Sequence, residues 1–421
     1  MNMTRLFLYI IICMFGAMPA YAFTDTRQGT YDDRVRSLQV YPERDTSAPP
    51  VITLGSGDKI VVKFDILSTD RDYLRYELIH CNADWQPSGL VDTEFLSGFN
   101  QGSIDDYAFS QLTTTHYVNY RLTIPNDEIS PTLSGNYLLR IYPEDDPDKT
   151  LAQARLMVSE QSAGIDADVT TRTDVDYNRA HQQLSVRIDT ERAGVDDPFN
   201  DLKVMIQQNG RYDNEVALSK PLRMQGRNIS IYEHLSPLIF EAGNEYRRFE
   251  TVSVHYPGMG VAEIEYHDPY YHFTLYTDEP RNELPYSYDQ TQHGRFLVRE
   301  YNSAQSDIEA DYVVVHFSLD APELPGSMIF IDGDMVNRRF DPESLMVYNR
   351  ATSRYERTML LKQGAYNYQY LVVPAGANRG STAGIEGNDY RTVNEYTIKV
   401  YTRRPTDRYD RLIGVSRIST E

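Results

Sequence analysis

Apolar and polar residues alternate in short stretches along almost the whole chain. The segment 183–188 (QLSVRI) places leucine, valine and isoleucine at every second position, and the segment 229–232 (ISIY) repeats this arrangement. A period of two predicts a β-strand with one buried side and one solvent-facing side. The segment 311–319 (DYVVVHFSL) is a more continuous apolar run, which is typical of a central strand in a sandwich.

Turn-forming pairs separate these predicted strands, among them Asn209-Gly210, Asp332-Gly333 and Gln363-Gly364. The 33 tyrosines also favour strands, because a tyrosine ring packs on a pleated surface while its hydroxyl stays in water. Longer helical periodicity is absent, and only the segments 232–242 and 344–349 are candidates for a short helix or turn. The chain is therefore predicted to be all-β, with tandem immunoglobulin-like β-sandwich domains.

Two breaks in the alternation divide the chain. Polarity rises near residues 159–164 and again near 301–309, just before the DYVVVHFSL run. A chain of 421 residues is too long for a single core. We therefore expect three sandwich domains, at residues 23–160, 161–305 and 306–421, each within the usual size of a domain.

The N-terminal segment has the pattern of a secretory signal peptide. Arg5 is followed by an apolar stretch over residues 6–17 and by Ala20-Tyr21-Ala22, an A-x-A cleavage site. The apolar stretch is too short to span a bilayer, which needs about 20 residues. Cys13 lacks the small residue expected directly before a lipidated cysteine. We therefore expect a signal peptide at residues 1–22 that is cleaved, export of the chain, and a soluble mature protein without membrane insertion.

The net charge of the chain narrows the classes of partner. The formal net charge is −20, which disfavours nucleic acid and anionic lipid as partners. A solvated surface explains this charge better than an acidic docking patch.

Cys81 is the only cysteine left after cleavage, so the fold must be stable without an intramolecular disulfide. Cys81 alternates with Ile79 and is expected to be a buried apolar residue.

Motifs for catalysis and for metal binding are missing. The chain has no G-x-S-x-G element and no H-E-x-x-H element, and residues 55–57 and 258–260 are glycine turns. His267 and His272 would lie on opposite faces of an extended segment, and the acidic segment 144–148 is typical of a solvated hairpin loop. We therefore expect no catalytic residue, no cofactor and no metal. A pair of hydrolytic carboxylates would meet only in the fold, so a hydrolase stays open as a third hypothesis.

The last predicted domain offers an alternative function. Its segments 326–335 (GSMIFIDGDM) and 363–373 (QGAYNYQYLVV) are similar to immunoglobulin-like modules that accompany starch- and glycogen-acting enzymes. Those modules stack exposed tryptophans on sugar rings, but no tryptophan follows Trp85 here. The tyrosines that could stack instead are Tyr355, Tyr366, Tyr368 and Tyr370. The alternative hypothesis is therefore a periplasmic or secreted carbohydrate-binding β-sandwich protein.

Four segments carry a family resemblance. They are GSGDKIVVKFDIL (55–67), YELIHCNADWQPSGLVDTEFLSGFN (76–100), HYVNYRLTIPN (116–126) and SGNYLLRIY (134–142). Their order resembles the first domain of the plug protein of the type IX secretion system, over roughly residues 31–160. The resemblance implies a periplasmic, non-catalytic subunit that docks on the inner mouth of the outer-membrane translocon barrel and closes it. Alone, such a chain is expected to be a monomer.

Two groups of residues are candidate contacts with that barrel. The first surrounds the only tryptophan and consists of Trp85, Phe95, Leu96 and Phe99; aromatic anchors dominate interface energetics. Packing of Trp85 into the first core is the competing interpretation. The second group, Arg403 and Arg404, belongs to a basic cluster in an acidic chain, and arginine is enriched at protein interfaces. A solvated loop before the last strand is the alternative there.

Overall fold

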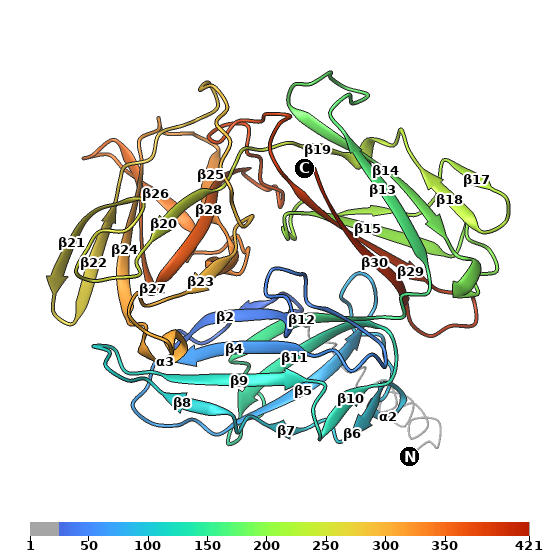
Figure 1. The fold of residues 1–421 in the computed structure, drawn as a ribbon, viewed down its shortest axis with the longest axis horizontal. Coiled ribbons are helices and arrows are strands. Elements are labelled where there is room, and N and C mark those ends of the chain that lie inside the picture. Colours follow the sequence, from blue (N-terminus) through green and yellow to red (C-terminus); the bar gives the residue numbers. More distant parts are fainter. Residues whose placement is uncertain (1–24, 421) are drawn as a thin grey trace, which may run out of the picture.

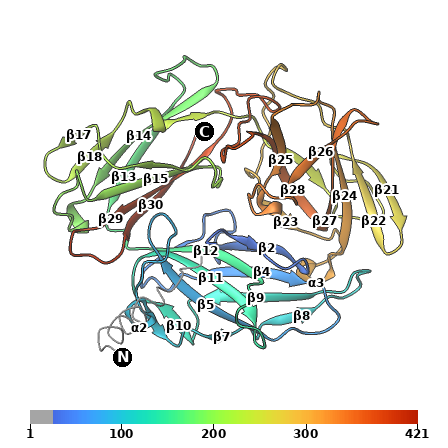
Figure 2. The ribbon, with the colours of Figure 1, turned by 180° about the vertical axis from the view of Figure 1, so that it is seen from behind.

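A computed structural model describes residues 25–420 of the chain. Strands dominate, and they build three lobes arranged around a common centre (Figure 1). The reverse view shows the same three lobes (Figure 2). The prediction of an all-β protein is confirmed. The signal peptide predicted at residues 1–22 lies outside the described residues, and within 25–420 no helix is long and apolar enough to cross a membrane.

The first lobe, at the bottom of Figure 1, follows the order of the N-terminal segments. One sheet contains β1 (Gly29–Thr30), β3 (Val51–Thr53), β5 (Leu74–Cys81), β7 (Gly102–Ser103), β11 (Gly135–Pro143) and β12 (Ala152–Ser159). The facing sheet contains β2 (Val35–Pro42), β4 (Ile60–Ile66), β8 (Tyr107–Phe109) and β9 (Val118–Ile124). Beside them lie the helix α2 (Asp92–Phe95) and a small pair, β6 (Leu96–Gly98) and β10 (Ile129–Pro131).

Alternation explains how these strands build the first core. In β5, Leu74, Tyr76 and Leu78 are buried, while the residues between them are partly exposed. Strand β11 is buried almost throughout, because one face covers the first core and the other face meets the second lobe, where Leu138 packs beside Tyr401.

The second lobe, at the upper right of Figure 1, combines strands from two distant parts of the chain. Its first sheet contains β13 (Gly164–Thr170), β14 (His181–Asp189), β17 (Arg223–Gln225), β18 (Ile229–Tyr232) and β19 (Ile239–Glu241). Its second sheet contains β15 (Leu202–Gln208), β16 (Val216–Leu218), β29 (Glu395–Thr402) and β30 (Arg411–Ser419). Short 3-10 turns are η1 (Glu191–Ala193) and η2 (Ser236–Leu238).

The third lobe, at the upper left of Figure 1, is one nine-stranded sheet that folds around its own core. Its strands are β20 (Arg247–Glu250), β21 (Val261–His267), β22 (Tyr270–Leu275), β23 (Phe296–Val298), β24 (Tyr312–Leu319), β25 (Ser327–Asp332), β26 (Leu345–Asn349), β27 (Arg354–Lys362) and β28 (Gly364–Pro374). Contact between its two halves is seen where the ring of Phe249 on β20 meets the ring of Phe317 on β24. A short helix α3 (Ser306–Glu309) and η3 (Asp334–Val336) complete it.

Strand pairing divides the chain differently from the boundary predicted near residue 305. Strand β29 pairs with β15 along its whole length, for example Val400 with Val204, so the C-terminal strands complete the second lobe. Strand β20 pairs instead with β28, within the third lobe. The third lobe is therefore inserted between strands of the second. The physical reason is that alternation shows which face of a strand is buried, but does not determine which other strand pairs with it.

The two candidate short helices have different outcomes. The segment 232–242 contains the 3-10 helix η2, followed by β19, as predicted, whereas the segment 344–349 contains the strand β26. Pairing within a sheet therefore outweighs the weak local pattern only at 344–349.

Candidate functional site

The tryptophan group is mostly buried, which corrects the expectation that it forms an exposed contact surface. Trp85 packs in a small cluster with Tyr401 and Leu412, between the first and second lobes. The guanidinium carbon of Arg155 lies 4.4 Å from its ring centroid, close enough for a cation–π contact. Trp85 therefore joins two lobes of the same chain and is not available to a partner in this conformation.

Phe95 and Leu96 are buried as well, in the core of the first lobe. The ring of Phe95 lies 5.9 Å from the ring of Tyr137. Phe99, by contrast, is 74% exposed, directly after strand β6. Of the aromatic and aliphatic candidates in this segment, Phe99 is therefore the one that a partner can reach.

The arginine pair lies in the loop between β29 and β30. Arg404 pairs with Asp407 at 3.1 Å, and Arg403 lies 3.9 Å from Asp410. The same loop reaches the first lobe, where Arg408 pairs with Glu94 of α2 at 2.5 Å. The loop and the helix therefore meet, and both groups of candidates lie at one side of the molecule. We name this region, consisting of Phe99, Arg403, Arg404 and Arg408, the α2 corner.

Polar contacts hold the first and third lobes together, and the local sequence pattern indicates them only weakly. Asp65 of β4 and Lys362 of β27 form an ion pair at 2.6 Å, with both side chains only 1% exposed. The hydroxyl of Tyr312 donates to the same carboxylate at 2.7 Å. Lys63 pairs with Asp307 at 2.7 Å near the rim of this interface. Two charged residues within the apolar strand IVVKFDI, Lys63 and Asp65, were the signal that could have pointed to this interface.

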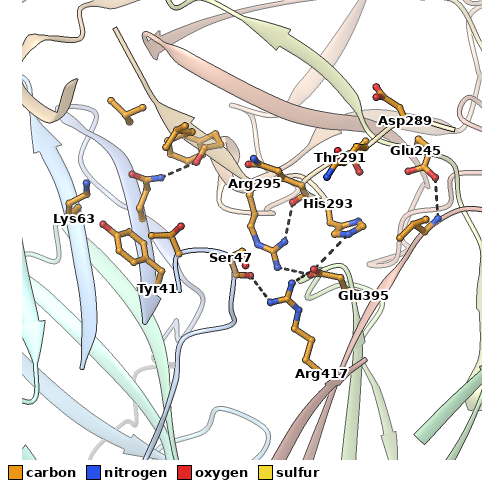
Figure 3. Close-up of a pocket in the computed structure, with 18 of the residues that line it drawn as sticks. Tyr41, Ser47, Lys63, Glu245, Asp289, Thr291, His293, Arg295, Glu395 and Arg417 are labelled. Carbon is orange, nitrogen blue, oxygen red and sulfur yellow. Dashed lines mark hydrogen bonds and ion pairs between the residues drawn. The ribbon is translucent and has the colours of Figure 1, made fainter. Parts of the chain in front are cut away.

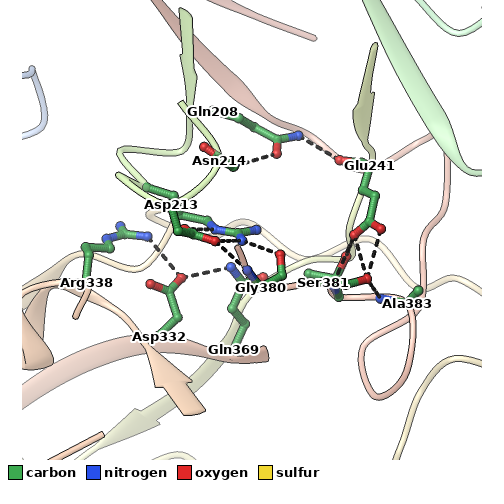
Figure 4. Close-up of polar contacts among 12 residues, drawn as sticks. Gln208, Asp213, Asn214, Glu241, Asp332, Arg338, Gln369, Gly380, Ser381 and Ala383 are labelled. Atoms are coloured by element: carbon green, nitrogen blue, oxygen red, sulfur yellow. Dashed lines mark hydrogen bonds and ion pairs between the residues drawn. The ribbon is translucent and has the colours of Figure 1, made fainter. Parts of the chain in front are cut away.

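The second and third lobes are joined in the same manner (Figure 4). The buried guanidinium of Arg211 pairs with Asp213 and donates to the carbonyl of Gly380 at 2.8 Å. Glu241 of β19 accepts from the hydroxyl of Ser381 at 2.9 Å. Buried polar groups that are satisfied in this way specify one arrangement, since breaking a contact leaves a desolvated group unpaired. The three lobes therefore form a single body.

A cavity of about 470 Å³ lies where the three lobes meet (Figure 3). The first lobe contributes Tyr41, Ser47 and Lys63, and the second contributes Glu395 and Arg417. The segment 288–298 of the third lobe forms most of the remaining wall, to which Glu245 and Asp307 also contribute. Periodicity and motifs did not indicate this cavity, because its walls come from parts of the chain that are far apart.

Glu395 is the electrostatic centre of the cavity. Arg295 pairs with one of its carboxylate oxygens at 2.7 Å, and Arg417 pairs with the other. The two guanidinium groups help to hold the pKa of Glu395 below its ordinary value, although burial opposes them. His293 Nε2 lies 3.8 Å from the same carboxylate. Burial lowers the pKa of His293 to about 4, so this imidazole is neutral at neutral pH.

The cysteine and the histidine pair considered for reactivity and metal binding do not form such sites within the described residues. Cys81 is buried, and burial raises the pKa of its thiol to about 12. His267 and His272 were expected on opposite faces, but the turn between β21 and β22 brings their ring centroids to 5.1 Å. Within residues 25–420, no group of three or more histidine, cysteine, aspartate or glutamate residues is arranged to hold a metal ion.

The tyrosines considered for sugar stacking are not surface groups. Tyr355, Tyr366, Tyr368 and Tyr370 are all buried in the core of the third lobe. The hydroxyls of Tyr368 and Tyr370 donate to Asp278 at 2.7 and 2.8 Å. These rings cannot stack on a sugar in this conformation, so the observation that motivated carbohydrate binding does not support it.

Comparison with known proteins gives a consistent picture. Residues 35–160 match the model of the "Type 9 secretion system plug protein 1st domain". A crystal structure of a hypothetical protein from Parabacteroides merdae is 42% identical, covers 94% of this chain and 99% of that chain, and superposes with a TM-score of 0.92. No curated protein matches the chain.

A further solved structure, an alkylpurine DNA glycosylase from Pseudomonas fluorescens bound to DNA, is 11% identical over 30% of each chain. Its TM-score of 0.17 is too low for any structural conclusion. The match over residues 35–160 leads to one assignment: this chain belongs to the type IX secretion system plug protein family.

Proposed function

We propose that this chain is a non-catalytic periplasmic subunit that docks on the inner mouth of the type IX outer-membrane translocon barrel and closes it. The observation that carries the proposal is the match of residues 35–160 to the plug domain model. A wide barrel leaves an aqueous channel. A subunit that closes this channel must be folded to block it, and it needs no catalytic activity to do so.

The contacts between the lobes support this role. Asp65 and Lys362 join the first and third lobes, Arg211 and Gly380 join the third and second, and Trp85 packs between the first and second. A body held on all three sides keeps its shape when it binds and leaves. Rigid contact surfaces lose less conformational entropy on association than mobile ones.

The α2 corner is the docking surface that we propose. Phe99 supplies an exposed aromatic side chain, and Arg403 and Arg404 belong to the loop whose Arg408 contacts Glu94 of α2. Arginine and aromatic residues are enriched in protein interfaces. The contact of Arg408 with Glu94 keeps the loop and the helix together, so both groups could meet one partner.

Affinity purification tests docking. The tagged mature chain is recovered from native envelopes solubilised in mild detergent, and co-purified proteins are identified by mass spectrometry. We expect one very large outer-membrane β-barrel protein in near-stoichiometric amount. Recovery of the chain without any barrel protein would contradict the proposed docking.

A pair of matched variants tests the docking surface. Phe99→Ser removes an aromatic side chain that is 74% exposed, and Tyr256→Ser removes one that is 76% exposed on the third lobe. We expect less barrel protein with Phe99→Ser and an unchanged amount with Tyr256→Ser. Equal recovery with both variants would place the contact outside the α2 corner.

A further inference from the structure

Within residues 25–420, the second lobe has a sheet edge that no other strand covers. Strand β13 lies at the end of its sheet and pairs only with β14, through seven consecutive residue pairs without a register shift (Figure 1). Several other edges are shorter or irregular: β8, β16 and β17 have three residues each, and the pairing of β21 shifts between Val261 and Glu263. A long, regular edge is unusual, because an extended chain can pair with it.

The free backbone groups of this edge follow from the neighbouring ladder. In an antiparallel sheet, the N–H and C=O groups of successive residues point alternately to the two sides of a strand. Next to β14, Thr190 donates to Asn228 and Ala180 accepts from Ala242, so the even-numbered residues of β14 face away from β13. Its odd-numbered residues therefore bond to the even-numbered residues of β13. The residues of β13 whose backbone groups point outward, without a partner within residues 25–420, are Ile165, Ala167 and Val169.

A groove of about 470 Å³ lies beside this edge. Val169 of β13 and Ile418 of β30 line it, and both strands are edges of their sheets. The two side chains pack against the core of the second lobe but are only partly buried. Beyond the end of β13, Val175 and Tyr177 are 62% and 61% exposed. A strand added to β13 would direct every second side chain toward the groove, where an apolar group would cover Val169 and Ile418.

The outer face of β13 is acidic. Asp166 and Asp168 are exposed, and β13 contains no basic residue. Arg187 lies opposite Asp166 but on β14, one strand farther from the free edge. Arg391, which also lines the groove, pairs with Asp389 at 2.8 Å. The side chains of an added strand would lie about 5 Å from those of β13, so lysine or arginine is favoured beside the two aspartates.

The same charges argue against a second copy of this chain as the occupant. If two β13 strands paired antiparallel about Ala167, Asp166 of each copy would lie opposite Asp168 of the other. Like charges that lie directly opposite each other destabilise a strand pair. A different chain with basic residues at these positions fits the edge better.

We propose that the β13 edge binds an extended segment of a partner protein in which apolar residues alternate with lysine or arginine. The apolar residues pair with Ile165, Ala167 and Val169, and the basic residues lie beside Asp166 and Asp168. In this mode of recognition, backbone hydrogen bonds supply affinity and alternate side chains supply specificity. The edge includes no residue of the α2 corner, so this proposal and the proposed docking on the barrel succeed or fail separately.

Fluorescence anisotropy with synthetic peptides tests the edge. The probe is fluorescein-Thr-Val-Lys-Val-Lys-Val-Thr-amide, in which the three valines would pair with β13. One comparison peptide carries N-methyl groups on the valines and keeps both lysines, and a second has glutamate in place of lysine. We expect the mature chain to bind the probe at least about tenfold more tightly than either comparison peptide. The N-methyl groups remove three hydrogen-bond donors, and the glutamates would lie beside two aspartates.

Variants locate the binding on β13. Ala167→Pro removes an outward N–H, and a sheet edge tolerates proline where the N–H faces solvent. We expect about tenfold weaker binding of the probe with this variant. The double variant Asp166→Lys, Asp168→Lys reverses the charge of the edge and should prefer the glutamate peptide to the probe. The control Asp145→Lys, Asp148→Lys makes the same change at two exposed positions of the first lobe and should keep the preference for lysine.

These measurements give clear refuting outcomes. The proposal is overturned if the probe does not bind, if the N-methylated peptide binds equally well, or if Ala167→Pro binds the probe fully. If Ala167→Pro does not fold, the charge-reversed variant still decides, and its retained preference for the lysine peptide would overturn the proposal. Sedimentation that shows a dimer of the wild type and a monomer of Ala167→Pro would also overturn it, since a second copy would then occupy the edge.

Discussion

Replacing Lys362 with methionine tests whether a buried ion pair holds the first and third lobes together. The substitution keeps an unbranched stem of similar length but removes the ammonium group. That group lies 2.6 Å from a carboxylate oxygen of Asp65 and 4.1 Å from the ring centroid of Tyr117. After the change, Asp65 keeps its hydrogen bonds from Asn119 and Tyr312, each at 2.7 Å, but loses its cation.

The burial of the Asp65–Lys362 pair sets the expected loss in the free energy of unfolding. Removing one partner of a buried pair leaves an uncompensated charge and costs about 3–5 kcal/mol. The control is Lys149→Met, because Lys149 pairs with Asp32 at the same 2.6 Å but is 44% exposed, whereas Lys362 is 1% exposed. A pair in contact with water contributes about 1 kcal/mol or less. The two variants therefore differ in burial while the pairing distance is the same.

Urea unfolding followed by circular dichroism measures both losses. We expect the free energy of unfolding to fall by about 3 kcal/mol or more for Lys362→Met and by less than about 1 kcal/mol for Lys149→Met. The double variant Asp65→Asn, Lys362→Met removes both charges and should recover much of the loss, because an amide can still accept from Tyr312. Equal losses for the two single variants would refute the argument from burial.

Three further predictions concern single buried groups. Burial lowers the pKa of His293 to about 4, so between that value and the ordinary value of about 6.5 the unfolded chain binds a proton that the folded chain does not. The free energy of unfolding should therefore decrease as pH falls through this range, by up to about 3 kcal/mol from His293; urea titrations at several pH values should show a smaller slope in His293→Phe than in the wild type, the rest coming from His80, His272 and His316, whose pKa values burial also lowers. Trp85 is the only tryptophan and is buried, so its fluorescence should be emitted at short wavelength and resist quenching by iodide until the chain unfolds; quenching in the native state would contradict its place between two lobes. The thiol of Cys81 is buried and its pKa is raised to about 12, so Ellman's reagent should react with it only after urea is added, and rapid reaction of the native chain would count against this.

Local pattern predicted the strands well where one face is buried. The segment 183–188 lies in β14, where Leu184, Val186 and Ile188 are buried as the alternation indicated. The run 311–319 contains β24, a central strand between β22 and β27. These predictions needed only the period of the side chains along a strand, which is set by the backbone itself.

The local pattern did not determine which of the candidate partner contacts are exposed. Trp85 follows a strand and could have faced either solvent or core, and its burial depends on Tyr401 and Leu412. Those residues come from the other end of the chain, so nothing near Trp85 in sequence could indicate them. Phe99 lies only fourteen positions after Trp85 yet is exposed, because no strand of another lobe covers it.

The sequence by itself determined the all-β class, the family resemblance of the first domain, and the burial of Cys81. The fold class and the burial of Cys81 need only the alternation that determines which face of a strand is apolar, whereas the resemblance rests on the order of four segments. Only the tertiary structure decided that β29 pairs with β15, that Lys362 meets Asp65, and that Glu395 lies among three lobes. The physical reason is that backbone hydrogen bonds are the same for every strand, so the choice of neighbour depends on the packing of the complete chain.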